Sequence, residues 1–140
     1  MDSLYREEIL EHFRNPLNFG KLKKYDSSSK QVNPFCGDEI EMFIRFKQIS
    51  AGVVTKTPQG CIINEIKFIG KGCAICMAAT SMLTEYSKGK TKKVLTKFSE
   101  KDMLGMLNIE ISQTRKKCAL LGLGVLKDCL NLTCHSEQTD

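Results

Sequence analysis

The sequence predicts a single α+β domain over residues 1–140, a three-stranded antiparallel sheet with helices packed on one face. Two hydrophobic periods carry this prediction. Between residues 39 and 47 apolar side chains alternate with polar ones, which is the pattern of a half-buried strand. From residue 75 onward apolar side chains recur with the spacing of amphipathic helices. A chain of 140 residues is also long enough to bury a core without the help of disulfides.

The first half of the chain is predicted to hold one helix and the sheet. Ser3 can cap a helix over residues 3–14, which Asn15-Pro16 ends. Residues 15–33 read as an ordered turn followed by a mobile loop that contains the polar run 26–30. Three strands should then form an antiparallel meander, with an extended hairpin around residues 49–60. They are expected at residues 39–47, 53–55 and 61–69.

The second half of the chain is predicted to be helical. Gly89 is a suitable C-cap for the first helix and Ser99 a suitable N-cap for the second. The helices are expected at residues 75–86, 100–107 and 114–130. The core of the domain then spans about residues 3–130, and the tail over residues 131–140 is expected to be mobile.

The composition favours a cytoplasmic protein that binds neither nucleic acid nor membrane. A net charge of +5 is modest, and the basic runs at residues 88–97 and 115–117 accompany no nucleic-acid reader motif. A solvated helix face or an acidic protein partner explains them better. No apolar run approaches the roughly 20 residues of a membrane span, and no secretory signal is visible. In this setting the seven cysteines are expected to serve metals or chemistry more than disulfides.

Three cysteines and one aspartate form a candidate metal site. Cys36 and Asp38 flank Gly37, which lets the chain turn so that the carboxylate lies beside the thiol. Cys73 is expected at the start of a helix and Cys118 in the first turn of the last helix, where the helix dipole or neighbouring basic residues favour thiolate. Such a set suits zinc, iron or an iron–sulfur cluster. A carboxylate is more readily displaced than a thiolate, so Asp38 is expected to act as an exchangeable gate.

The other cysteines and the two histidines are expected to be structural, with one exception left open. Three are expected to be chemically inert: Cys61 on a strand, Cys129 among the leucines of the last helix and Cys134 in the tail. Cys76 follows Cys73 by one helical turn, so a resolving or alternative acceptor thiol remains possible beside the packing role. His12 is expected to pack or cap on the first helix, and His135 to lie exposed in the tail.

The boxes around these residues resemble the IscU/SufU family of iron–sulfur cluster assembly scaffolds, also called NifU N-terminal-like proteins. The resemblance runs from about Tyr5 to Leu130. Its most specific parts are the Cys-Gly-Asp, Gly-Cys-Ala and Lys-Cys-Ala boxes, in that order at residues 36–38, 72–74 and 117–119. Further matches are Tyr5, His12, Asn15-Pro16, Asn18, Gly20, Asn33-Pro34, Phe68, Gly70, Ile75, residues 81–85 and Arg115. The family fold agrees with the fold predicted above.

The resemblance implies a partner of a pyridoxal-phosphate cysteine desulfurase. The desulfurase would deliver sulfur as a persulfide, with Cys118 as the acceptor. Iron and sulfide would then assemble a transient [2Fe–2S] cluster on Cys36, Cys73 and Cys118, with Asp38 assisting exchange. The cluster would pass to apo-proteins, and zinc would occupy the resting site.

Some departures from the family pattern favour the SufU branch and others favour the IscU branch. The IscU branch carries a histidine before the last cysteine, whereas this chain has Lys117, as in the SufU branch. The insertion usual in SufU proteins between the second and third cysteines is absent, and the stretch from Asp38 to Cys73 is longer than usual in IscU. Residues 110–114 lack the proline-containing chaperone motif, so no Hsp70-type chaperone is expected as a partner.

Two functions therefore remain open. The preferred hypothesis is an assembly scaffold that turns nothing over by itself and is not an enzyme. The alternative is a zinc-dependent sulfur acceptor, a sulfurtransferase that activates its desulfurase. Lys117 favours the alternative, whereas the short spacing between Cys73 and Cys118 favours the scaffold. A purely structural zinc domain fits less well, because structural zinc sites use closed Cys/His sets.

Overall fold

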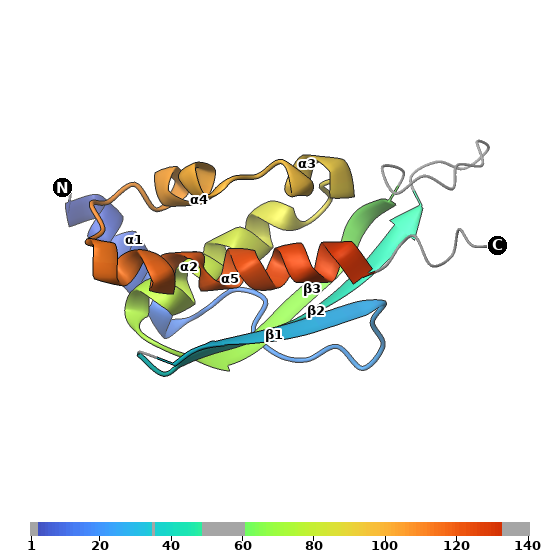
Figure 1. The fold of residues 1–140 in the computed structure, drawn as a ribbon, viewed down its shortest axis with the longest axis horizontal. Helices are drawn as coiled ribbons and strands as arrows, with labels where there is room; N and C mark the ends of the chain where they lie inside the picture. The colour runs from blue at the N-terminus through green and yellow to red at the C-terminus, as the bar shows by residue number, and fades with distance from the viewer. Residues whose placement is uncertain (1–2, 35, 49–60, 133–140) are drawn as a thin grey trace.

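The computed structural model describes residues 3–34, 36–48 and 61–132. Within them the chain forms five helices and three strands (Figure 1). In chain order these are α1 (Ser3–Arg14), β1 (Ser27–Asn33), β2 (Asp38–Gln48), β3 (Cys61–Lys71), α2 (Ala74–Ser87), α3 (Lys92–Thr96), α4 (Glu100–Leu107) and α5 (Gln113–Leu132). No helix in these ranges is long and apolar enough to cross a membrane.

The three strands form one antiparallel sheet in the order β1-β2-β3, which confirms the predicted fold class. The strands predicted at residues 39–47 and 61–69 are β2 and β3, each slightly longer than expected. The strand predicted at residues 53–55 lies outside the described residues. The first strand of the sheet is instead β1, part of which was predicted to be a mobile loop.

The prediction of a loop at residues 26–30 was wrong because contacts with α5 hold this polar segment in place. Ser27 Oγ donates to the carbonyl of Cys129 at 2.8 Å, and Gln31 Nε2 donates to Asp128 Oδ2 at 2.7 Å. These partners are about a hundred residues away in the sequence. A serine-rich strand with no apolar alternation therefore gives no local signal of its structure.

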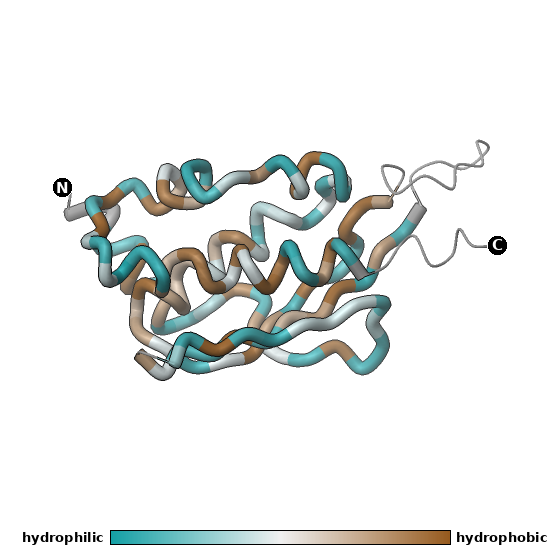
Figure 2. The backbone as a smooth tube through the Cα atoms, in the orientation of Figure 1, coloured by the Kyte–Doolittle hydropathy of each residue, from teal (hydrophilic) through white to brown (hydrophobic). Residues whose placement is uncertain are grey.

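The helices cover one face of the sheet (Figure 1). The alternating side chains of β2, Ile40, Met42 and Ile44, are fully buried beneath them, since α5 contacts β1 and β2 and α2 contacts β3. The hydropathy colouring shows hydrophobic residues distributed along these packed elements (Figure 2). On the opposite face, the ring of Phe43 is covered by Tyr25, with ring centroids 5.2 Å apart.

The predicted helices are all present, with one addition. The helices at residues 3–14 and 100–107 have the predicted bounds, and Ser99 forms a capping box with Asp102. α2 and α5 differ from prediction by one or two residues at their ends. The single-turn helix α3 was not predicted; the Thr91 side chain caps it by accepting from the Val94 amide at 3.1 Å.

The close approach of α2 and α5 depends on Gly122, because a Cβ there would overlap the Thr80 hydroxyl. We expect Gly122→Ala to lower the free energy of unfolding by about 1–3 kcal/mol, as overpacking does in other cores. Gly105→Ala is the matched control, since a Cβ at that helical position would meet nothing within 4 Å. It should be neutral or stabilising by up to about 1 kcal/mol. Urea unfolding of both variants tests this; equal stabilities would contradict it.

Candidate metal centre

The turn between β1 and β2 carries two of the predicted ligands, Cys36 and Asp38. Asn33 and Asp38 face each other across the hairpin, and the Gly37 amide donates to the Asn33 carbonyl at 2.8 Å. Gly37 has φ 78°, a left-handed conformation that a side chain would strain. The turn leaves Cys36 exposed, whereas Asp38 is 1% exposed. Cys36 Sγ donates to Asp38 Oδ2 at 3.0 Å, so the predicted pairing of thiol and carboxylate is present.

Cys73 lies at the N-cap of α2, as predicted. Its extended backbone (φ −72°, ψ 170°) lets Sγ accept from the Cys76 amide at 3.5 Å. Its own amide donates to Asp38 Oδ1 at 3.1 Å. The carboxylate of Asp38 therefore ties the β1–β2 turn to the start of α2.

Cys118 lies in the second turn of α5 rather than in the first, and it is only 3% exposed. Its Sγ is 3.5 Å from Cys36 Sγ. Burial raises the pKa of the Cys118 thiol, and contacts with Asp38, Cys36 and Cys73 raise it further. The basic residues before Cys118 were expected to favour thiolate, but desolvation and the neighbouring Asp38 carboxylate oppose that charge.

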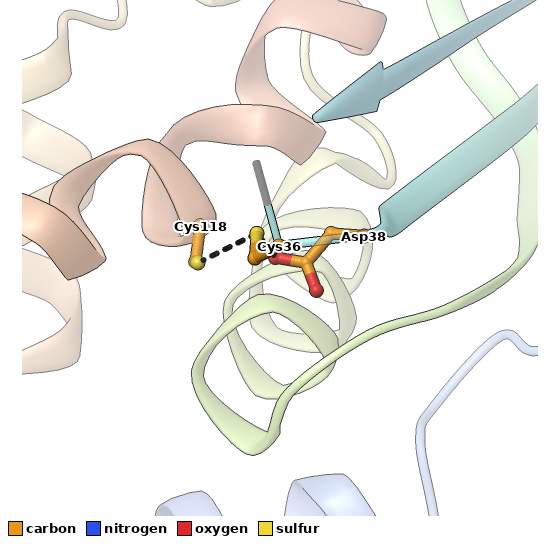
Figure 3. Close-up of side chains that lie close together, drawn as sticks. All are labelled: Cys36, Asp38 and Cys118. Atoms are coloured by element: carbon orange, nitrogen blue, oxygen red, sulfur yellow. Dashed lines mark hydrogen bonds between the residues drawn. The ribbon is translucent and has the colours of Figure 1, made fainter. Parts of the chain in front are cut away.

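The donor atoms of Cys36, Asp38 and Cys118 all lie within 4.8 Å of one another (Figure 3). Cys73 is outside this group, although its thiol also contacts Cys118. Burial opposes ionisation of Asp38, but hydrogen bonds from Cys36, Cys118 and the Cys73 amide, together with the charge of Arg115, hold the pKa of Asp38 below its usual value. The site thus contains an ionised carboxylate that accepts hydrogen bonds from two neighbouring thiols.

This donor set fits a thiophilic metal. Sulfur ligands with one carboxylate suit zinc and iron rather than magnesium or calcium. Thiols must lose their protons to bind, so a metal would replace the hydrogen-bonding protons that now link Cys36, Asp38 and Cys118. The Asp38 carboxylate, held by the Cys73 amide, would keep its orientation in the process.

Gly72 makes room for the carboxylate. A Cβ at this position would lie 2.7 Å from Asp38 Oδ1 and 3.0 Å from Asp38 Cγ. The glycine before Cys73 thus lets the end of β3 approach Asp38 closely. Sequence inspection missed this contact because the two residues are far apart in the chain.

Among the described residues, the remaining cysteines lie outside the group of converging donor atoms. Cys76 is fully buried on α2, and burial raises the pKa of its thiol, which disfavours a role in chemistry. Cys129 is also buried, and desolvation raises the pKa of its thiol to about 12, in line with a core position. Cys61 is buried too, but it is disulfide-bonded rather than the inert free cysteine that was expected. Cys134 and His135 lie outside the described residues.

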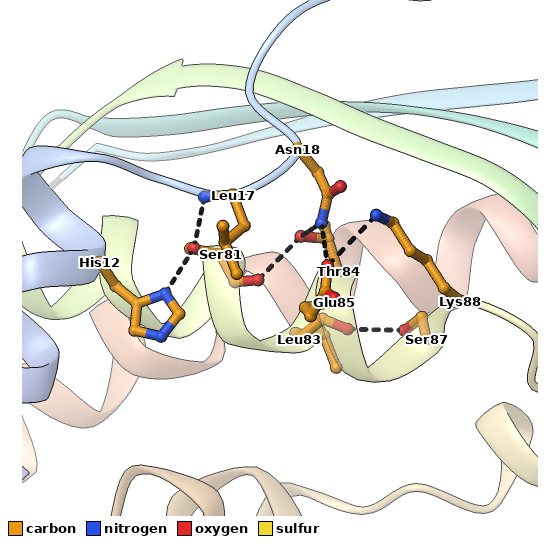
Figure 4. A network of polar contacts seen from close by, with 9 residues as sticks. All are labelled: His12, Leu17, Asn18, Ser81, Leu83, Thr84, Glu85, Ser87 and Lys88. Carbon is orange, nitrogen blue, oxygen red and sulfur yellow. Dashed lines mark hydrogen bonds and ion pairs between the residues drawn. The ribbon is translucent and has the colours of Figure 1, made fainter.

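His12 is a packing residue, as expected, and not a ligand of this group. Its Nδ1 lies 2.7 Å from Ser81 Oγ on α2 (Figure 4). The Leu17 amide donates to the same oxygen at 2.8 Å. These contacts fasten the end of α1 and the following turn to the middle of α2.

Two cavities of about 420 Å³ each border the site and meet at Asn33 and Lys117. One reaches Cys36 between the β1–β2 turn and the start of α5, where Gln113 and Thr114 line it. The other continues along β1 and α5. The exposed thiol of Cys36 thus faces open space, while Cys118 lies behind it.

The molecule is thus a small α+β domain, a three-stranded antiparallel sheet with helices on one face, whose Cys-Gly-Asp turn meets two further cysteines at a candidate metal site. The sequence matches the profile of the NifU-like N terminal domain family over residues 4–133. The chain therefore belongs to this family.

Its relatives include both branches anticipated from the sequence. It is 38% identical to the zinc-dependent sulfurtransferase SufU of Bacillus subtilis, over 64% of this chain and 52% of that protein. It is 36% identical to the iron–sulfur cluster assembly scaffold protein IscU 1 of Archaeoglobus fulgidus, over 63% and 50% respectively. The chain thus spans about half the length of these two relatives. It is 31% identical to IscU of Aquifex aeolicus over 87% of this chain and 71% of that one.

Solved structures agree on the fold. A Fervidobacterium islandicum protein, described as a putative iron–sulfur cluster assembly scaffold for the SUF system, superposes with a TM-score of 0.70 and 25% identity. The match covers 89% of this chain and 94% of that one. The N-terminal domain of a NifU-like protein from Brucella abortus superposes with a TM-score of 0.69 at 18% identity, over 99% and 98% of the two chains.

The contact at Gly72 yields a test of the site. Gly72→Ala should displace the Asp38 carboxylate and weaken zinc binding about tenfold or more, as loss of ligand orientation does elsewhere. Gly105→Ala, at an open position, should bind zinc like the wild type. Competition with a chromophoric chelator measures both affinities. Equal zinc affinity in the two variants would show that the orientation of Asp38 does not matter for binding.

Proposed function

We propose that this protein is an iron–sulfur cluster assembly scaffold that accepts sulfur from a cysteine desulfurase, builds a [2Fe–2S] cluster and passes it to apo-proteins. The observation that carries the proposal is the convergence of Cys36, Asp38 and Cys118 within 4.8 Å, with Cys73 beside them. Membership of a family with members named as scaffolds supports it.

The four residues have different parts in this proposal. Cys36, Cys73 and Cys118 would bind iron as thiolates, and metal binding would release their protons. Asp38 is the exchangeable ligand, since its carboxylate is ionised and a harder donor than the thiolates. Because its Oδ1 already accepts from the Cys73 amide, Asp38 can leave a metal without losing all of its hydrogen bonds.

The exposure of the thiols suggests the order of sulfur transfer. Cys36 is exposed and Cys118 is buried 3.5 Å behind it. The Cys36 thiolate would attack the outer sulfur of the donor persulfide; the new S–S bond forms as the donor S–S bond breaks, and the donor leaves as a thiolate. A second exchange of the same kind would pass the outer sulfur to Cys118 and restore Cys36. Neither step needs an oxidant, because sulfur moves at an unchanged oxidation state.

A zinc-dependent sulfurtransferase is the second candidate function. Lys117 favours it, because a lysine stands where the IscU branch has a histidine ligand. The relationship to the sulfurtransferase SufU supports it as well. In this case zinc would be held by Cys36, Asp38, Cys73 and Cys118, and it would supply charge that stabilises a thiolate for sulfur transfer.

Anaerobic reconstitution separates the two functions. The protein is stripped of metal, mixed with ferrous iron, cysteine, a cysteine desulfurase and a thiol reductant that converts persulfide sulfur to sulfide, and followed by its visible spectrum. A cluster chromophore that transfers to an apo-ferredoxin is the result expected for a scaffold. Absence of a chromophore, with desulfurase turnover that rises only when zinc is restored, would overturn the scaffold and favour the sulfurtransferase.

The variant Asp38→Ala tests whether Asp38 is the ligand that is displaced when a cluster is released. We expect this variant to keep a bound cluster longer than the wild type, because the ligand that yields to an incoming thiolate is gone. The decay of the visible absorbance in the presence of apo-ferredoxin measures the release rate. Faster loss of the cluster than in the wild type would show that Asp38 holds the cluster rather than gating its exit.

Two serine variants test the order of sulfur transfer. Cys36→Ser should reduce persulfide loading by about tenfold or more, since the exposed entry thiol is lost. Cys118→Ser should remove the final acceptor and leave any persulfide on Cys36. Peptide mass spectrometry after brief exposure to the desulfurase locates the added sulfur. If Cys118 carries as much persulfide in the Cys36→Ser variant as in the wild type, sulfur reaches the buried thiol directly and the proposed order is wrong.

A further inference from the structure

The end of α1 and the turn after it expose large apolar side chains that no part of the metal site uses. Three of the six large hydrophobic side chains that are exposed among the described residues occur within seven positions. These are Phe13 (42% exposed), Leu17 (42%) and Phe19 (46%), here called the apolar ridge. Grouped exposed apolar side chains are typical of interaction sites.

The ridge is held rigidly by hydrogen bonds to α2. Ser81 Oγ accepts a hydrogen bond from the Leu17 amide and also contacts the His12 ring (Figure 4). His12 and Leu17 precede and follow Phe13 in the chain, so both sides of Phe13 are fixed to α2. Asn18, which adopts a left-handed conformation with φ 62°, turns its amide group toward α2. Its Nδ2 donates at 3.1 Å to each of two acceptors there, Thr84 Oγ1 and Glu85 Oε1.

The ridge is also fastened to the edge of β3. The Phe68 amide donates to the Asn18 carbonyl at 3.0 Å, and the Gly20 amide donates to the Phe68 carbonyl at 2.8 Å. The ring of Phe19 meets that of Phe68 edge-on, with centroids 5.4 Å apart. A partner would therefore meet a preformed surface, and little conformational entropy would be lost on binding.

Basic side chains predominate along the segment that carries the ridge, and the two carboxylates bonded to it, Glu11 and Glu85, accept from Asn15 and Asn18. The sequence has no aspartate or glutamate between Glu11 and Asp26, whereas four exposed basic residues lie in that interval. They are Arg14, Lys21, Lys23 and Lys24. From β3, the Lys67 ammonium also lies close to Gly20, since a Cβ on that glycine would be 3.9 Å from Nζ. The complementary surface would be acidic around an apolar centre.

We propose that the apolar ridge and its cationic rim dock an acidic acceptor protein whose contact surface has apolar side chains ringed by carboxylates. This inference rests on the proposed function. A second copy of the chain would bring two cationic rims together, which repulsion opposes. Single-stranded nucleic acid stacks on exposed ring faces, and Leu17, in the middle of the ridge, offers none.

The position of the ridge suits a protein that exchanges material with the metal site. Ser81 and Glu85 follow Cys73 by eight and twelve residues on α2, which corresponds to about 12–18 Å along the helix axis. A standard interface of about 800 Å² per partner is about 30 Å across. A protein seated on the ridge can therefore also reach the end of α2 that carries Cys73.

The test measures binding of an acidic apo-ferredoxin to the full chain by isothermal titration. Leu17→Ser and Phe13→Ser should each weaken binding about tenfold. Val94→Ser is the matched control, because Val94 is 43% exposed on α3, away from the ridge. Lys21→Glu should weaken binding and reduce its salt dependence, whereas Lys97→Glu at the end of α3 should not. Thermal melts confirm that each variant is folded.

Equal affinities for Leu17→Ser and Val94→Ser would overturn the proposal, as would absence of binding by the wild type. Tighter binding of a single-stranded RNA oligonucleotide through Phe13 and Leu17 would overturn it in favour of a nucleic-acid surface. The outcome is separable from the proposed function. If ferredoxin binding depends on Leu17 but no cluster forms on the wild type, the docking surface stands and the scaffold function fails.

Discussion

The hydrogen bonds of the Asp38 carboxylate connect the two halves of the candidate metal site. Asp38 begins β2, directly after the turn that carries Cys36, and its oxygens accept from the Cys36 thiol and from the Cys73 amide at the start of α2. A buried carboxylate without such donors would be costly, so the turn and the helix end must stay together for it to remain ionised. The close approach at Gly72 makes this arrangement possible.

The same arrangement divides the thiols by accessibility. Cys36 stands on an exposed turn beside a cavity, whereas Cys118 is held by α5 under the surface, where burial raises the pKa of its thiol. An exposed thiol suits exchange with another protein, and a buried one suits retention of what has been received. A site that both accepts and holds sulfur or metal needs both, and here the two sulfur atoms are 3.5 Å apart.

Sequence patterns predicted most of the fold because most of it follows local rules. The alternation of Ile40, Met42 and Ile44 identified β2, and the capping residue Ser99 located the start of α4. β1 was missed because its polar residues are ordered by α5, through bonds such as that from Ser27 to Cys129. The basic residues before Cys118 suggested a thiolate, but Arg115 and Lys117 are exposed while the thiol itself is buried.

The sequence by itself determined the fold class, the family and the four candidate ligands, since these depend on periodicity and on short motifs whose chemistry is local. Only the tertiary structure decided which donor atoms meet, which thiol is exposed and which glycine admits the carboxylate. It also showed that Cys76 is fully buried directly behind Cys73 and that Leu17 and Phe19 are exposed. Burial and the pKa of a thiol arise from residues distant in the chain, so no local pattern encodes them.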